Sequence, residues 1–119
     1  MSISKDEYKK AVSRLEEAIS QKKNDFIRDS VIQRFEFSVE LAWKTCKKVM
    51  GSSSVAPKDI IREMAQSGYI DNPEEWILAI DMRNLSSHTY KEELAEKVYN
   101  FACNFITDLK ALLVILESK

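Results

Sequence analysis

The sequence predicts an all-α protein, an up-and-down antiparallel bundle of four or five helices formed by a single domain over residues 1–119. Apolar side chains recur every three or four residues along most of the chain, which is the spacing of one face of an α-helix. The 119 residues include only two glycines and two prolines, too few for the many turns of an all-β fold. A hydrophobic share of 45% beside 31% charged residues indicates a packed core rather than a disordered chain.

The first two helices are expected at about residues 4–21 and about residues 25–50. In the first, Ser4 and Glu7 have the spacing of a capping box, in which a hydroxyl and a carboxylate satisfy free backbone N–H groups. The second is expected to end at Gly51, because glycine accepts the left-handed conformation that follows many helices. At 1.5 Å per residue the second helix would be roughly 39 Å long, so the bundle should be elongated.

Lysines and a tryptophan gather near the end of the second helix. Lys44, Lys47 and Lys48 are interpreted as partners of the helix dipole, with phosphate binding as the alternative. Trp43 and Trp76 are expected to anchor the core, and base stacking is their alternative role.

Two shorter helices are expected next. Pro57 opens the third, which is predicted to end at Gly68. The fourth starts at Asn72-Pro73, where asparagine caps, proline takes the first helical position and Glu75 can reach back. Because the fourth helix is apolar around most of its circumference, it should be buried.

The last helix is expected from Thr89 to about residue 117, with Thr89 and Glu92 as a second capping box. Its apolar stripe and that of the second helix are wide enough to bury a second copy of the chain. Two-fold dimers are the commonest oligomers, so the sequence favours a homodimer.

Membrane attachment and bound cofactors are not expected. No apolar run reaches the roughly 18–20 residues that span a bilayer, and the first residues lack the apolar segment of a signal peptide. We therefore expect a cytoplasmic protein. Cys46 and Cys103 form no Cys-x-x-Cys pair, and a single histidine completes no Cys/His zinc set, so both should be reduced thiols.

The chemically informative stretch is residues 81–90, which contains Arg83, His88 and Tyr90. An arginine on a buried helix needs a partner, which could be a carboxylate such as Asp81, another subunit or a bound phosphate. A guanidinium holds phosphate through paired hydrogen bonds, and a histidine titrates near neutral pH and moves protons. The other polar side chains that could orient or hold a phosphate here are Asn84, Ser86 and Ser87.

The pattern Arg83-x4-His88-x-Tyr90, on an all-helical chain of this length, resembles the HEPN superfamily (higher eukaryotes and prokaryotes nucleotide-binding). More narrowly, residues 81–90 are similar to the nucleotidyltransferase substrate-binding protein family, most sharply at Asp81-Met82-Arg83-Asn84. The resemblance covers nearly the whole chain. It implies a HEPN-like bundle that dimerises and a minimal nucleotidyltransferase (MNT) as partner.

The resemblance implies an activity as well. Many HEPN proteins with this motif are metal-independent ribonuclease toxins whose MNT partner is the antitoxin. Arg83, Asn84 and His88 would then be catalytic, Arg83, Ser86 and Ser87 would bind the RNA phosphate, and Tyr90 would accept an AMP group that silences the toxin.

Two other functions remain open from the sequence. One is a non-catalytic subunit that presents a nucleotide or another substrate to a nucleotidyltransferase, and the other is a structural helical dimer without a site. The chain is not expected to be a nucleotidyltransferase itself. It lacks the Gly-Ser motif followed by an Asp-x-Asp pair that two-metal nucleotidyl transfer requires.

Overall fold

The computed structural model describes residues 2–119, with side chains from residue 5 onward. Every regular element in that range is helical, which confirms the predicted all-α class. The elements are α1 (Ser2–Ile19), α2 (Asp25–Met50), α3 (Pro57–Gln66), α4 (Pro73–Leu85), the short 3₁₀ turn η1 (Ser86–His88) and α5 (Glu92–Glu117).

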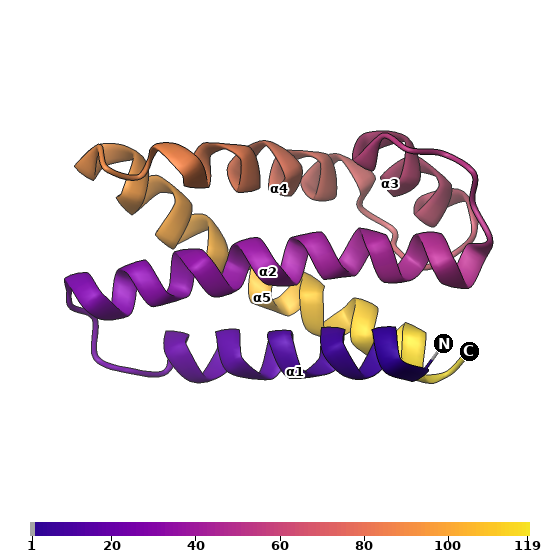
Figure 1. Cartoon of the computed structure of the whole chain (residues 1–119), viewed down its shortest axis with the longest axis horizontal. Helices are drawn as coiled ribbons and strands as arrows, with labels where there is room; N and C mark the ends of the chain where they lie inside the picture. The colour runs from indigo at the N-terminus through magenta and orange to yellow at the C-terminus, as the bar shows by residue number, and fades with distance from the viewer. Residues whose placement is uncertain (1) are drawn as a thin grey trace.

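The helices form an elongated bundle (Figure 1). α1, α2 and α5 pack on one another, and α4 packs on α2, α3 and α5. α5 crosses diagonally from the end of α4 to the end of the molecule where both termini lie. The two 26-residue helices, α2 and α5, each rise about 39 Å, which is the 39 Å length of the molecule.

Aromatic rings join the helices at the centre of the core. Trp76 of α4 is only 1% exposed, and its ring meets Phe105 of α5 edge to face at 4.8 Å between centroids. Phe105 also meets Phe35 of α2 at 6.4 Å. The buried Tyr8 hydroxyl donates a hydrogen bond to the Leu109 carbonyl oxygen at 2.7 Å, which ties α1 to α5. The prediction that Trp76 anchors the core is confirmed.

Several predicted boundaries are confirmed. α2 ends at Met50 and is capped by Gly51, whose φ of 65° lies in the left-handed region and whose N–H donates to the Lys47 and Lys48 carbonyl oxygens. α3 starts at Pro57 but ends at Gln66, two residues before Gly68. The side chain of Asn24, a cap that the sequence analysis did not identify, accepts a hydrogen bond from the Ile27 N–H at 2.8 Å.

Other capping predictions are wrong. α4 starts after Asn72 as expected, but the Asn72 amide caps nothing and instead donates to Asp108 of α5 at 2.7 Å. α5 starts at Glu92 rather than Thr89, because the Thr89 hydroxyl is drawn back to the Ser86 carbonyl oxygen at 3.2 Å. α1 already begins at Ser2, and the side chain of Ser4 lies outside the described ones.

α5 departs from the expectation that no segment could span a bilayer. Within residues 2–119 it is the one helix that is long and apolar enough to do so, judged by length and composition alone. Its buried residues, among them Val98, Phe105 and Leu112, instead belong to the core shared with the other helices. Cys46 is buried and Cys103 partly buried, both as free thiols, and burial raises the pKa of Cys46 to about 12.

Candidate functional site

The segment from the end of α4 to the start of α5 is held in a tight turn by hydrogen bonds from its own serine hydroxyl groups. The Ser86 hydroxyl donates to the Arg83 carbonyl oxygen at 2.5 Å, and the Ser87 hydroxyl donates to that of Asn84 at 3.1 Å. These bonds satisfy carbonyls that a helix leaves free at its C-terminal end, and they favour the tight turn η1. Ser86 and Ser87, the predicted phosphate ligands, therefore use their hydroxyl protons within the chain.

Arg83 forms ion pairs with two carboxylates of the neighbouring helix α2. Its Nε lies 3.1 Å from Glu40 Oε1, and its Nη1 lies 3.3 Å from Glu36 Oε2. The guanidinium side chain is still 29% exposed. Of the three kinds of partner expected, the chain supplies carboxylates, though Asp81 is not one of them because it pairs with Lys58 at 2.8 Å.

Glu40 is shared between two cations. Its second oxygen, Oε2, lies 3.2 Å from Lys44 Nζ, one turn further along α2. Partial burial acts to raise the pKa of Glu40, but Lys44 and Arg83 outweigh it and hold that pKa below its ordinary value. Glu40 is therefore charged at neutral pH, and Arg83 pairs with both Glu40 and Glu36.

His88 and Tyr90 lie beside each other on the surface. Their ring centroids are 6.2 Å apart at an interplanar angle of 67°, and Tyr90 is 79% exposed. His88 and Asn84 are exposed as well. Both rings are thus accessible to a molecule that binds at this surface.

A second arginine, which the sequence analysis missed, fixes the helix that follows this segment. Arg28 of α2 is buried, and its Nη1 pairs with Glu96 at 3.1 Å and with Glu92 in the first turn of α5. Hydrogen bonds to Glu92 and then Glu96 raise the pKa of Arg28 above its ordinary value. The signal lay in the helical spacing, since Arg28 precedes Ile32 and Phe35 on the apolar stripe of α2.

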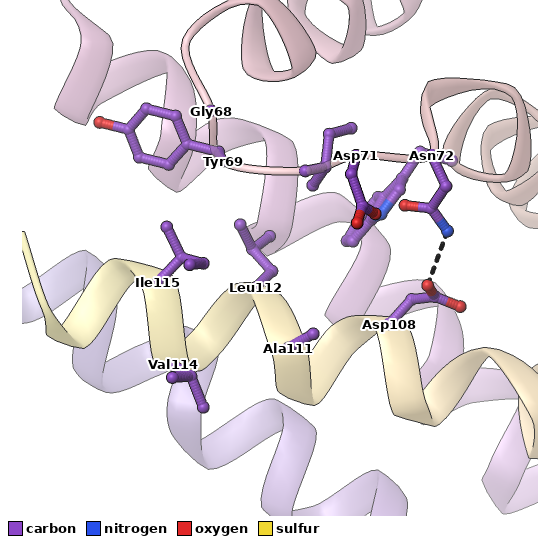
Figure 2. Close-up of a pocket in the computed structure, with 11 residues that line it drawn as sticks. Gly68, Tyr69, Asp71, Asn72, Asp108, Ala111, Leu112, Val114 and Ile115 are labelled. Atoms are coloured by element: carbon purple, nitrogen blue, oxygen red, sulfur yellow. Dashed lines mark hydrogen bonds between the residues drawn. The ribbon is translucent and has the colours of Figure 1, made fainter.

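A hollow of about 580 Å³ lies elsewhere, between the loop before α4 and the C-terminal half of α5 (Figure 2). Its lining includes Tyr69, Asn72, Trp76 and Leu112, and Figure 2 shows the hydrogen bond from Asn72 to Asp108 at its edge. None of its lining residues belongs to the 81–90 segment. Among the described residues, no group of three or more His, Cys, Asp or Glu side chains is arranged to hold a metal ion.

Comparisons with known proteins agree with the fold and with the family that the sequence resembles. The model of the family described as "Nucleotidyltransferase substrate binding protein like" matches residues 4–118. A protein of Haemophilus influenzae named "Probable ribonuclease HepT" is 33% identical over 103 residues, covering 80% of this chain and 70% of the relative. A crystal structure of a protein from Thermus thermophilus superposes with a TM-score of 0.83 at 27% identity, over 92% of this chain and 98% of the other. The chain therefore belongs to the nucleotidyltransferase substrate-binding protein family, within the HEPN superfamily.

Proposed function

We propose that this chain is a metal-independent endoribonuclease, the cytoplasmic toxin of a toxin–antitoxin pair whose other member is a minimal nucleotidyltransferase. The observation that carries the proposal is the exposed pair of rings, His88 and Tyr90, which follows directly on the helix that carries Arg83. Residue types suited to proton transfer, to modification and to phosphate binding thus lie within eight positions of the chain, residues 83–90. The name of the Haemophilus influenzae relative, a probable ribonuclease, supports RNA cleavage as the reaction.

RNA cleavage without a metal needs three functions. A base takes the proton of the ribose 2′-hydroxyl, whose oxygen bonds to the adjacent phosphorus while the bond to the 5′-oxygen breaks. An acid gives a proton to that leaving oxygen, and a cation stabilises the charge on the phosphate. We assign proton transfer to His88, charge stabilisation to Arg83, and orientation of the phosphate or the imidazole to Asn84. The turn hydroxyls of Ser86 and Ser87 complete the phosphate site as acceptors of water-mediated contacts.

One chain supplies a single histidine, whereas the reaction needs both an acid and a base. A two-fold homodimer would bring two copies of His88 and Arg83 to one interface, so that one imidazole starts as the base and the other as the acid. Light scattering on the purified protein tests this part, and a monomer that still cleaves RNA would contradict it.

Tyr90 gives the nucleotidyltransferase partner a point of control. Its ring is exposed beside the imidazole, so an AMP group on its hydroxyl would add a bulky anion at the catalytic side chain. Modification would therefore silence the nuclease. Co-expression with the partner should add the mass of AMP to the wild type and not to Tyr90→Phe.

The decisive experiment is cleavage of total cellular RNA by the purified protein in EDTA, beside His88→Ala. We expect the wild type to cleave and His88→Ala to be slower by roughly 100-fold or more. Because His88 is exposed, the variant should keep the fold, which circular dichroism checks. Retained cleavage by His88→Ala would remove the histidine from the mechanism.

The second candidate is a non-catalytic subunit that presents a nucleotide or another substrate to the nucleotidyltransferase. The ion pairs of Arg83 with Glu36 and Glu40 favour it over the nuclease, since carboxylates that neutralise the guanidinium weaken the charge stabilisation that cleavage of the phosphodiester requires. A wild type that is folded, dimeric and unmodified at Tyr90 by intact mass, yet leaves RNA intact, would refute the nuclease and favour this candidate.

A further inference from the structure

The C-terminal half of α2 carries a hollow that the proposed function does not use. It measures about 490 Å³ and is lined by Trp43, Lys44, Lys47, Lys48, Gly51 and Ser52. We name it the lysine groove. Among these six lining residues there are three cations and no carboxylate, so the groove attracts anions.

Trp43 gives the groove an aromatic wall. The indole is half-buried, with one part packed against the core and another facing the groove. Lys44 Nζ lies over the ring, 5.6 Å from its centre. A base that stacks on the indole would take the place of this ammonium group, which can then turn to the phosphate of the same nucleotide. A partly exposed ring flanked by cations is the combination with which proteins bind single-stranded nucleic acid, because the base stacks while the phosphate meets the charge.

The helix dipole does not account for all three lysines. Lys47 and Lys48 lie in the last turn of α2, where a cation stabilises the free carbonyls. Lys44 lies before that turn and contacts Glu40, not the helix end. The cations therefore extend along the helix surface rather than clustering only at its terminus.

The lysine groove adjoins the Arg83 site through the ion pairs of Glu40. Glu40 contacts both Arg83 and Lys44, so these two cations are separated by one carboxylate. Lys47 lies seven residues beyond Glu40, about 10 Å further along α2 at 1.5 Å per residue. In Figure 1 this direction along α2 leads away from the α4–α5 junction toward α3. A strand bound at Arg83 can therefore continue over Lys44 to the lysine groove.

We propose that the lysine groove binds one nucleotide of a single RNA strand, with its base on Trp43 and its phosphate between Lys44 and Lys47, while neighbouring nucleotides lie at Arg83 and His88. The inference rests on the proposed nuclease function and names where its substrate is held outside the reacting bond. Because stacking accepts any base and lysines contact only phosphate, the groove adds affinity without sequence preference.

The test uses a fluorescein-labelled 2′-O-methyl oligonucleotide of about 12 residues, within the usual footprint of single-strand binding proteins. It cannot be cleaved, because the attacking hydroxyl is blocked, so binding is measured apart from catalysis. Fluorescence anisotropy in EDTA compares the wild type with Lys44→Glu/Lys47→Glu and with Trp43→Ala. Lys9→Glu/Lys10→Glu on α1 is the matched charge control, since both are exposed helical lysines and the net charge changes by the same amount.

We expect the double lysine variant to weaken binding at least ten-fold and to flatten the salt dependence by about 0.7 in logarithmic slope per lost phosphate contact. Trp43→Ala should weaken binding roughly five-fold or more, the loss of one stacked base. Lys9→Glu/Lys10→Glu should bind like the wild type. Equal binding by Lys44→Glu/Lys47→Glu and Lys9→Glu/Lys10→Glu would overturn the inference. Because Lys44 and Lys47 both reach the surface, this outcome can be read even if Trp43→Ala misfolds.

A free nucleotide offers the same base and phosphate as a strand, so AMP is tested as a competitor. If the strand is the ligand, AMP should displace the oligonucleotide only at far higher concentration; displacement at equal concentration would overturn the assignment to RNA. The proposed nuclease function fails separately. Loss of binding in the lysine variant without cleavage by the wild type would refute the nuclease alone, and His88-dependent cleavage with unchanged binding would refute the groove alone.

Discussion

Arg28 and Arg83 are held in the same way in different surroundings. Each joins two glutamates that are one helical turn apart on another helix: Glu92 and Glu96 for Arg28, Glu36 and Glu40 for Arg83. The Arg28 side chain is 8% exposed and that of Arg83 29% exposed. The same pairing of an arginine with two glutamates can therefore serve a structural role at Arg28 and a ligand-binding role at Arg83.

Exposure decides whether a charged ligand can compete for the guanidinium. The Arg28 side chain is buried and pairs with two glutamates of the first turns of α5, so its ion pairs fix the position of α5. Arg83 faces solvent beside the His88 segment, where water screens its ion pairs and a phosphate can replace a carboxylate. We therefore regard Arg28 as structural and Arg83 as the phosphate-binding arginine of the proposed nuclease.

The largest expected effect is on activity, in Arg83→Ala. Loss of the cation that stabilises the phosphate should slow RNA cleavage by roughly 100- to 1000-fold. The free energy of unfolding should change by less than about 1 kcal/mol, because the lost ion pairs are partly exposed. Cleavage rates in EDTA and urea unfolding measure the two quantities. A variant that unfolds easily and cleaves normally would reverse the roles of the two arginines.

Arg28→Ala should show the opposite pattern. The loss of hydrogen bonds between charged groups and of the packed side chain should lower the free energy of unfolding by about 2 kcal/mol. Cleavage per folded molecule should stay close to that of the wild type. Urea unfolding monitored by circular dichroism is the measurement, and a double-mutant cycle with Glu96→Gln isolates the contribution of that ion pair. Unchanged stability would show that Arg28 does not hold α5.

The smallest effect is expected in Glu40→Gln. This variant tests whether the carboxylate competes with phosphate for Arg83. Removing one carboxylate frees Arg83, so RNA should bind a few-fold more tightly in the anisotropy assay. The stability change should stay under about 1 kcal/mol. Weaker RNA binding would mean that Glu40 positions Arg83 rather than competing with phosphate.

The same variant has a predicted pH signature. The pKa of Glu40 is lowered in the folded protein, so its contribution to stability is present above the usual glutamate value of 4.5 and is lost as the pH falls through the lowered value. Glu40→Gln should therefore lose less stability on acidification than the wild type. Thermal unfolding between neutral and acidic pH measures this, with Glu16→Gln at the exposed pair with Lys110 as control.

The sequence was a good guide to the helices and a poor one to their caps. The periodicity of apolar residues located α2 and α5, and Gly51 marked the end of α2 because the left-handed conformation there is a local property of the backbone. Thr89 and Asn72 are residue types that often cap helices. The Thr89 hydroxyl instead donates a hydrogen bond to the turn η1, and the Asn72 amide donates to Asp108 on α5. Caps depend on partners that distant segments supply.

By itself, the sequence determined the helical class, the order of the elements and the stretch that carries Arg83, His88 and Tyr90. These are local properties, set by spacing and residue type within a few turns of helix. Only the tertiary structure decided which carboxylates meet Arg83, that Arg28 is buried, and that Trp43 lines a groove of lysines. The physical reason is that these partners lie on different helices or exposed faces, and the packing of whole helices determines which side chains meet and which remain open to solvent.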